Sequence, residues 1–424
     1  MKKISALAVA GVFVASLAGT AFAEGTDLKI SGEIRLRDQW TNNKDYNADA
    51  GDVKNAITQR TRVNVDAKVD ERVKAYVSIE NNRNWGSSGP TFTNGVSTTS
   101  TTTAGVTTVN SVTADSDLVG LYQGYVVVDK LFDQPLLFKA GRQKIVLGNQ
   151  RLVAANDWGA GQTFDGWILG YNIDAVSVNG FSVTGVDRNS AATDVNGTLN
   201  GIYATIKSIP VTGIDVYAMQ KKELAAAATT GQNFFTYGVR ANGAAMNIDW
   251  DAEFALQSGD STSTAKKKAS AIWVVAGYSL PDVAKLRIGA EYDQLSGQDT
   301  STDDTAFDHL FYSKHASSNQ HSNYGITDIV EGSLGSGLKA FSINASAEPV
   351  EGLKFLAEYW NFSSAEDMAN GKTAIGSEMN LQAWYAVTKS TGVHAYYAMF
   401  TPSSDFAAKQ DAATDLVLQL QVAF

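Results

Sequence analysis

The sequence predicts an all-β protein, a transmembrane antiparallel β-barrel of about 18 strands. Three observations support this. The last nine residues, from Leu416 to Phe424, alternate in polarity and end on an aromatic residue, as the closing strand of a barrel does. The first 23 residues have the layout of an export signal. Between them, candidate strands are joined by short and long connections in regular alternation.

The N-terminus predicts a signal peptide over residues 1–23. Lys2 and Lys3 precede a mostly apolar stretch, and Ala21-Phe22-Ala23 places small residues where a signal peptidase recognises them. An uncleaved membrane anchor is the alternative, but the apolar stretch is interrupted and shorter than the ~20 residues of a spanning helix. No later stretch is apolar over that length. We therefore expect an exported protein of the bacterial outer membrane, with residues 24–424 forming one barrel domain.

Alternating or β-favouring stretches define the strands in chain order. The predicted ranges are 28–39, 57–68, 72–82, 117–129, 136–148, 163–170, 173–186, 201–209, 213–220, 234–242, 245–257, 270–280, 284–294, 337–348, 351–362, 378–389, 392–401 and 414–424.

Every second connection is tight, for example Val69-Asp70-Glu71 and Pro349-Val350. The intervening ones are long and polar, notably near residues 83–116 and 295–336. Short periplasmic turns and long extracellular loops are typical of outer-membrane barrels. The uncharged, Ser/Thr-rich residues 87–113 are expected to form an external loop that is either mobile or folded inward as a plug.

The two-residue period assigns the faces of each strand. Between residues 246 and 257, Met, Ile, Trp, Ala, Phe and Leu alternate with Asn, Asp, Glu and Gln. A Lys or Arg facing lipid near the midplane costs ~2–4 kcal/mol. The polar face is therefore expected to line a watery lumen.

Composition excludes several classes of function. The chain has no cysteine, which rules out disulfides and thiolate metal sites. Without Lys2 and Lys3, 32 basic residues stand against 44 acidic ones, a formal charge of −12. This balance argues against nucleic-acid binding, which needs a basic face. We expect no cofactor, and we expect outer-membrane lipid and hydrophilic or anionic solutes as partners of a monomer.

A set of basic side chains on early strands is the main candidate site. Arg35 and Arg37 share one face, as do Arg60 and Arg62, and Lys74 and Arg142 follow on later strands. Arginine offers a planar fork to carboxylate, sulfate or phosphate, and rings of such residues select anions. Salt bridging with Glu33, Asp66 and Glu80 is the alternative, and both can hold.

The strand of Arg142 allows two face assignments. Arg142 lines the lumen in one, and Lys139, Gly141 and Gln143 line it in the other.

His309, His315 and His321 share one long loop with several aspartates. Their six-residue spacing matches no compact metal motif, so we expect a solvated loop and no metal site. A Ser390–His394 hydrolytic pair is conceivable, but no feature marks either residue as activated.

Two segments resemble the alginate-export family of outer-membrane porins. The first runs from Gly141 to Leu152, with Asp157-Trp158 and Thr163-Phe164-Asp165-Gly166. The second is Phe307-Asp308-His309-Leu310-Phe311, His315, and Tyr324 to Asp328. The resemblance implies an 18-stranded monomeric barrel with an arginine-lined passage for an acidic polysaccharide or a smaller anion. It places Arg142, Arg151 and Asp165 in the matching motif and implies no specific cargo.

The expected function is a non-enzymatic channel for hydrophilic, anionic solutes, with Arg35, Arg37, Arg60, Arg62 and Arg142 at its constriction. A plugged structural or adhesive barrel and an outer-membrane hydrolase are the alternatives.

Overall fold

The computed structural model describes residues 27–50, 52–85, 100–103, 106–109, 119–155, 157–187, 197–223, 231–312 and 324–424. The predicted signal peptide, residues 1–23, lies outside the described residues.

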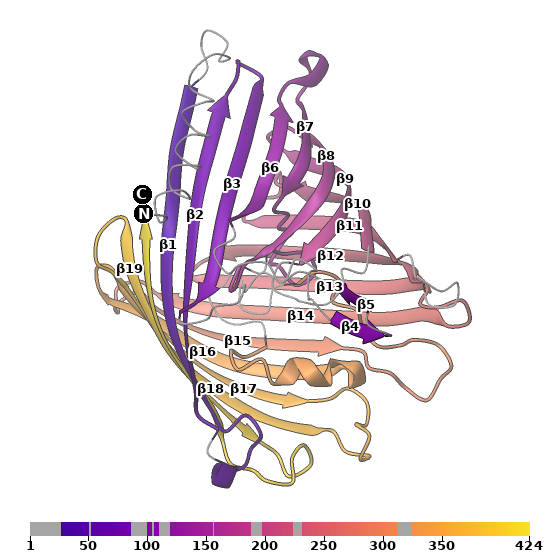
Figure 1. The fold of residues 1–424 in the computed structure, drawn as a ribbon, viewed down its shortest axis with the longest axis vertical. Helices are drawn as coiled ribbons and strands as arrows, with labels where there is room; N and C mark the ends of the chain where they lie inside the picture. The colour runs from indigo at the N-terminus through magenta and orange to yellow at the C-terminus, as the bar shows by residue number, and fades with distance from the viewer. Residues whose placement is uncertain are drawn as a thin grey trace.

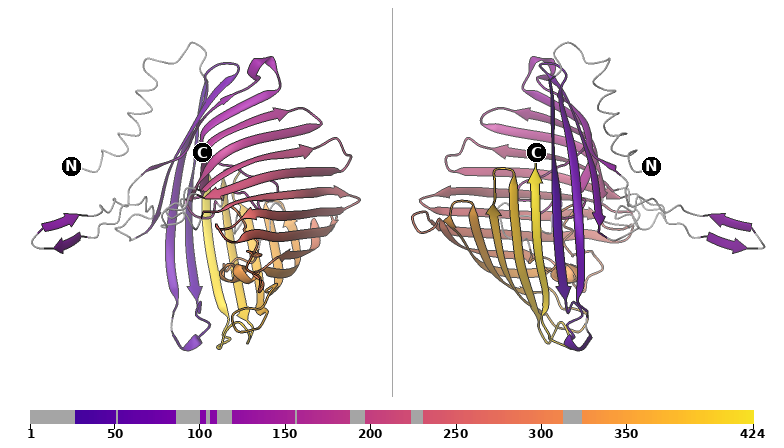
Figure 2. Two further views of the ribbon diagram at one scale, coloured as in Figure 1. Left: turned by 90° about the vertical axis from the view of Figure 1, so that its right-hand side faces the viewer. Right: turned by 60° about the vertical axis from the view of Figure 1, so that its left-hand side comes forward.

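Eighteen antiparallel strands form one closed sheet (Figure 1; Figure 2). Each strand pairs with its neighbours along the chain, and each of the 18 predicted ranges overlaps a strand. The strands are β1 (Asp27–Asn42), β2 (Lys54–Lys68), β3 (Val73–Asn84), β6 (Gly120–Val128), β7 (Leu136–Gln143), β8 (Gln162–Asn172), β9 (Val176–Asp187), β10 (Gly197–Ile206), β11 (Thr212–Glu223), β12 (Asn233–Ala245), β13 (Ile248–Asp260), β14 (Lys266–Leu280), β15 (Leu286–Leu295), β16 (Leu338–Val350), β17 (Leu353–Ser363), β18 (Ala374–Ala386), β19 (Thr391–Pro402) and β20 (Ala413–Ala423).

The last strand closes the barrel against the first. β20 pairs with β1 from Thr414 to Ala423, and the backbone groups of Phe424 and Gly32 exchange hydrogen bonds of 2.8 and 3.0 Å. The terminal strand predicted from the alternating C-terminal residues is therefore confirmed. Closure leaves no edge with unpaired backbone groups, each of which would cost several kcal/mol in lipid.

The faces of the strands follow the predicted alternation. On β13, Phe254 and Leu256 are 44% and 47% exposed on the outside, whereas Asp251 and Glu253 are each 5% exposed on the inside. The outer face of β13 therefore suits hydrocarbon, and its charged side chains face the inside of the barrel. Within the described ranges, no helix has both the length and the apolar character needed to cross a membrane.

Short turns join the strands at one end. Between β12 and β13 the turn is Met246-Asn247, three residues later than predicted, and both residues have positive φ (49° and 67°). Positive φ at both central residues is the type I′ geometry that matches the twist of a hairpin. The described parts of the connections contain three short 3₁₀ turns, η1 (Ala48–Ala50), η2 (Leu131–Asp133) and η3 (Val330–Ser336).

The predicted extension of one strand to residue 148 is wrong. β7 ends at Gln143, and residues 144–155 and 157–161 leave the wall and fold into the barrel. Gly148 and Gln150 have positive φ (53° and 71°), which turns the chain back on itself. Some of the apolar side chains that suggested a strand pack inside the barrel instead, where Ile145 and Leu152 are both 4% exposed.

The Ser/Thr-rich region contains a separate hairpin of β4 (Ser100–Thr103) and β5 (Val106–Val109). Figure 2 shows this hairpin beside the barrel and not inside it. The other residues between 87 and 113 lie outside the described residues, so a plug formed by this region stays a prediction.

Candidate functional site

Four arginines on the first two strands share the inner face of the barrel. Arg35 of β1 lies opposite Arg60 of β2, and Glu33 lies opposite Arg62. Neighbouring strands are ~4.8 Å apart and every second residue faces inward, so these side chains converge with Arg37 on one wall. Each arginine is at most 6% exposed. We call Arg35, Arg37, Arg60 and Arg62 the basic wall.

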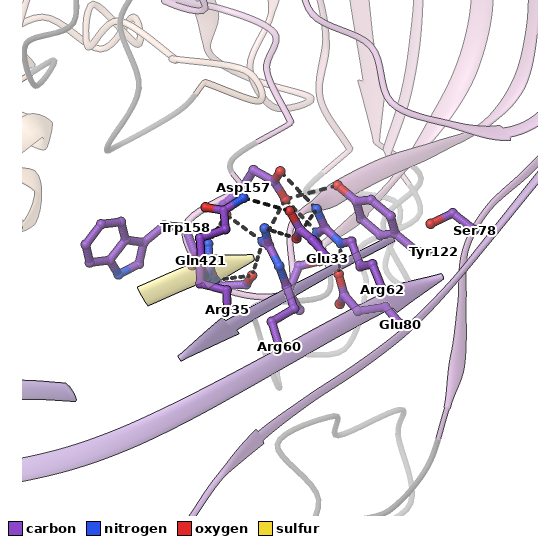
Figure 3. A network of polar contacts seen from close by, with 12 residues as sticks. Glu33, Arg35, Arg60, Arg62, Ser78, Glu80, Tyr122, Asp157, Trp158 and Gln421 are labelled. Atoms are coloured by element: carbon purple, nitrogen blue, oxygen red, sulfur yellow. Dashed lines mark hydrogen bonds and ion pairs between the residues drawn. The ribbon is translucent and has the colours of Figure 1, made fainter. Parts of the chain in front are cut away.

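Two arginines of the basic wall are paired with carboxylates. Arg60 lies 2.5 Å from Glu33. Arg62 lies 2.6 Å from Asp157 and forms a second ion pair with Glu80. The salt bridging considered as the alternative to selection is thus present for Glu33 and Glu80. Figure 3 shows that Asp157, which the sequence did not single out as a partner, sits at the centre of this network.

The other two arginines hold backbone and an aromatic ring. Arg35 donates hydrogen bonds to the carbonyl oxygens of Asp157 (3.0 Å) and Gly159 (3.2 Å). Arg37 donates to the carbonyl oxygen of Trp158 (2.8 Å), and its guanidinium lies 3.4 Å from the centroid of that indole ring. Among the described residues, neither Arg35 nor Arg37 forms an ion pair with a carboxylate.

Two stretches of chain fold into the lumen and meet there. The first inner segment is residues 144–155 with 157–161, and the second is residues 306–312 with 324–328. They join at Phe311, whose backbone N–H donates to Leu152 and whose carbonyl oxygen accepts from Ala154, each at 2.8 Å. The two stretches that carry the family resemblance therefore contribute both inner segments.

The opposite side of the lumen is acidic. Arg151 of the first inner segment lies 3.2 Å from Asp293 of β15 and also pairs with Glu291. Glu291, Asp293, Asp251 and Glu253 project inward from β13 and β15, and we call them the acidic wall. The first inner segment thus spans the lumen, with Asp157 held by the basic wall and Arg151 held by the acidic wall.

The second inner segment is fixed by a buried carboxylate and by rings. Glu378 of β18 accepts hydrogen bonds from the hydroxyl and the backbone N–H of Thr327 (2.5 and 3.3 Å). The Trp273 indole N–H donates to the Tyr324 hydroxyl at 2.8 Å. Gly325 has φ +83°, and a Cβ there would lie 2.6 Å from both carboxylate oxygens of Glu378. Only glycine allows this close approach.

Electrostatics stabilise Asp157 as an anion. Burial alone would raise the pKa of its carboxyl, but the hydrogen bond from Arg62 and the charges of Arg60 and Arg62 hold that pKa well below its usual range. The first inner segment is therefore held by an ion pair throughout the physiological pH range.

His309 differs from the solvated histidine that was expected. It is 8% exposed and packs among the rings of Phe307, Tyr312 and Tyr324. Burial lowers the pKa of His309 to about 4, so the ring is neutral at pH 7. In the part of the chain that the structure describes, no group of three or more His, Asp or Glu side chains could hold a metal ion. His315 and His321 lie outside that part.

Three further predicted residues lie apart from the basic wall. Lys74 faces the lumen near the short turns and lies 3.5 Å from Asp129. Arg142 forms a two-pronged hydrogen-bonded pair with Asp165, with both distances 2.7 Å.

The Arg142–Asp165 pair faces outward, which corrects the predicted lumenal position of Arg142. These residues alternate with the buried Gln143 and Phe164, and share their face with Trp167, which is 43% exposed. The alternative face, with Gln143 and Lys139 turned inward, is the one that the structure adopts.

Sequence reasoning missed the partner role of Asp157 and the convergence of the acidic wall. A signal for Asp157 was present, because it lies in the motif shared with the family while belonging to no alternating strand. No local signal links it to Arg62, which is 95 residues away in the sequence.

Comparisons with known proteins agree with this geometry. The family described as "Alginate export" matches residues 26–417. No curated protein matches the sequence significantly.

Several solved structures have a similar fold. OccK3 (OpdO) of Pseudomonas aeruginosa is 14% identical with a TM-score of 0.62, over 93% of this chain and 96% of that one. OccK8 (OprE) of the same organism is 14% identical with a TM-score of 0.62, over 96% and 99%. Acinetobacter baumannii OccAB3 is 14% identical with a TM-score of 0.62, over 94% and 99%. At this identity the likeness shows the fold alone.

Proposed function

Because the chain belongs to the alginate export family, it is a porin-like barrel of the bacterial outer membrane, and we propose that its lumen passes hydrophilic solutes with a preference for anions. On this proposal the protein is a monomeric, non-enzymatic channel. Passage is passive, and the basic wall borders its narrowest part.

The observation that carries the proposal is the surplus of positive charge on the basic wall. Its four arginines face three carboxylates, those of Glu33, Glu80 and Asp157, and the remaining hydrogen bonds go to neutral carbonyls. Arginine keeps its charge even when its donors are bound to neutral carbonyls, so the wall gives the lumen a positive potential that attracts a passing carboxylate or phosphate.

The acidic wall limits the degree of anion selectivity that we expect. Positive and negative groups face each other across the first inner segment, so the lumen has a transverse field. Small anions are then expected to pass along the basic wall. The channel should show moderate anion selectivity, because cations can follow the opposite side.

Reversal potentials measured in a KCl gradient across a planar bilayer test this proposal directly. A potential of anion-selective sign supports it, and a potential of cation-selective sign rules out the anion preference. Neutralising Arg60 and Arg62 together removes the positive charges that compensate Glu33, Glu80 and Asp157. The double variant R60Q/R62Q should therefore shift selectivity toward cations, and an unchanged potential would refute the role of these two residues.

A plugged barrel is the second candidate, and the dense packing inside the lumen favours it. Phe164, Trp273, Trp360 and Phe400 are at most 1% exposed, and together with the inner segments they form one apolar cluster. A sealed barrel would show no single-channel steps, whereas a channel would show them in the wild-type protein. The same recording thus separates the two candidates.

A hydrolase has less support. His394 contacts the side-chain oxygen of Gln382 at 3.2 Å and stacks on Trp384, so its ring is engaged with residues other than Ser390. Assays of purified protein for lipase and glycan-lyase activity should be negative.

A further inference from the structure

One part of the outer surface is polar at a height where other strands are apolar. Strands β7 to β11 lie side by side (Figure 1), and a row of outward side chains crosses all five in direct register. The row consists of Arg142, Asp165, Thr184, Thr198 and Lys222. Ser182 and Asn200 lie in the next outward row toward the short turns. We call these seven residues the outer polar patch.

The alternation along each strand places the patch on the outside. Leu199 of β10 is 0% exposed inside the barrel, and Ile202 on the opposite face is 57% exposed. The two patch residues of β10 share the face of Ile202. Lys221 of β11 pairs with Asp308 of the second inner segment at 2.7 Å, so the next residue, Lys222, points away from the lumen.

The patch lies within the height of the apolar band. Arg142 is six residues from the first residue of β7, at its short turn, and Thr198 is eight from the last residue of β10. At ~3.4 Å per residue and a tilt of ~45°, these positions are about 14–19 Å above the short turns, and the apolar band of such barrels is ~25 Å tall. At the same distances, Tyr359 of β17 and Ile272 of β14 are 46% and 38% exposed. The apolar band is thus narrower on the side of β7 to β11.

Hydrocarbon is a poor environment for the patch. Among the described residues, the side chains of Ser182, Thr184 and Asn200 have no hydrogen-bond partner, and Lys222 has no ion pair. A hydroxyl or amide without a partner is destabilised in an apolar medium. Trp167, at the next outward position of β8 toward the short turn, is 43% exposed, and tryptophan is typical of the level where headgroups meet hydrocarbon. We therefore expect lipid headgroups to reach down to the patch.

We propose that the outer polar patch binds the headgroup of a phosphorylated glycolipid in the outer leaflet. The patch lies toward the strand ends that lead into the long loops, which face the cell exterior in barrels of this kind. Its charges sum to +1, from Arg142 and Lys222 against Asp165, and this surplus suits a phosphate. Lys222 would pair with the phosphate, and the hydroxyl and amide side chains would bond the sugar and the amide groups that link the acyl chains.

Native mass spectrometry of the full mature protein in detergent micelles tests the site by counting bound lipids. Bis-phosphorylated lipid A is the probe, and phosphate-free lipid A and phosphatidylethanolamine are the comparison lipids. The wild type should bind the probe in preference to both. Lys222→Gln removes the cation that pairs with phosphate and should weaken binding of the probe about fivefold, as expected for an exposed ion pair.

Lys285→Gln is the matched control, because Lys285 is an exposed lysine in a short turn, paired with Glu348 at the other end of the barrel. It should bind lipid A as the wild type does. Heat-dependent electrophoretic mobility verifies that each variant forms the closed barrel. Equal lipid A affinity of wild type and Lys222→Gln, or equal binding of all three lipids, would overturn the site. A two-barrel particle that Lys222→Gln abolishes would place a second copy on the patch and would also overturn it.

The stability of Asn200→Leu in two kinds of vesicle gives an independent readout. In phosphatidylcholine vesicles the Asn200 amide faces hydrocarbon without a partner, so leucine should raise the urea concentration at the unfolding midpoint. In vesicles that also contain lipid A the amide has a partner, so the same change should lower that midpoint. Ala204→Leu, on the same face of β10 but nearer the short turn, should shift the midpoint in one direction in both kinds of vesicle. An Asn200→Leu shift of the same sign in both would overturn the proposal. Neither measurement depends on conduction.

Discussion

At the scale of the residue, the four arginines of the basic wall have different binding partners. Arg60 and Arg62 are compensated by carboxylates, whereas Arg35 and Arg37 are bound to carbonyl oxygens and an indole ring. A carbonyl dipole satisfies the guanidinium donors but leaves the net charge in place. Selectivity should therefore depend most on Arg35 and Arg37.

Neutralising that uncompensated pair provides the first prediction. The double variant R35Q/R37Q should lower anion selectivity and destabilise the fold by about 2 kcal/mol or more, because charge-assisted hydrogen bonds worth ~1.5–3 kcal/mol are lost. Reversal potentials and urea unfolding measure the two effects. Arg72→Gln, an arginine paired with Asp133 in an exposed turn, is the control. Equal effects of both changes would contradict the prediction.

Asp157 gives a second prediction, of opposite sign for selectivity. Asp157→Asn removes one of three carboxylates from the basic wall, so anion selectivity should rise. The first inner segment loses its ion pairs with the basic wall, and because the Asp157 side chain is 35% exposed the cost should be moderate, ~1–3 kcal/mol. Asp165→Asn breaks an outward pair and should leave the reversal potential unchanged. A fall in anion selectivity in Asp157→Asn would refute this account.

His309 predicts how stability depends on pH. Its pKa of about 4 in the folded protein lies below the ~6.5 of an unfolded chain, so the unfolded state binds the proton more readily. Stability should therefore fall as the pH drops from about 6.5 to about 4. Asp308, Arg151 and Lys267 also act on the ring, and the two cations favour its neutral form.

Thermal unfolding followed by circular dichroism between pH 4 and 7.5 measures this effect. His309→Gln should have a flatter profile over that window. An identical slope in wild type and variant would remove His309 from the explanation.

At the scale of the element, strands and inner segments follow different rules. A strand of this barrel has lipid on one side and the lumen on the other, so the polarity of its side chains repeats every two residues. The inner segments contact other parts of the chain on all sides. Their positions therefore depend on a few specific contacts, including the one between Gly325 and Glu378.

Gly325→Ala tests whether the second inner segment depends on that contact. The new Cβ would lie 2.6 Å from the Glu378 carboxylate at a positive φ, so we expect a loss of about 1–3 kcal/mol and a wider, noisier conductance. Gly335 in the same loop has nothing within 4 Å of an added Cβ, and Gly335→Ala is the matched control. The prediction fails if the two alanine variants unfold at the same urea concentration.

At the scale of the whole molecule, closure of the sheet makes the outer surface a continuous apolar band. Ile288, Ile343, Tyr359 and Leu418 are between 46% and 55% exposed on different strands of the outer face. Only a hydrocarbon environment removes this surface from water, at ~25 cal/mol per Å² of apolar area.

The mature protein should therefore need detergent or lipid to stay folded and dispersed, and its circular dichroism spectrum should be that of β-sheet. Sedimentation in buffers with and without detergent measures the first property. A monodisperse, folded protein in plain buffer, or a mainly helical spectrum, would contradict the membrane barrel as a whole.

The sequence by itself determined the barrel, because lipid and water impose a period of two that can be seen within one strand. It identified all 18 strands, the closing strand at the C-terminus and the inward faces of Arg35 and Arg60. Only the tertiary structure decided which groups those arginines bind. Asp157 reaches Arg62 across 95 residues and Arg151 reaches Glu291 across 140, and contacts at such separations leave no periodic trace in the chain.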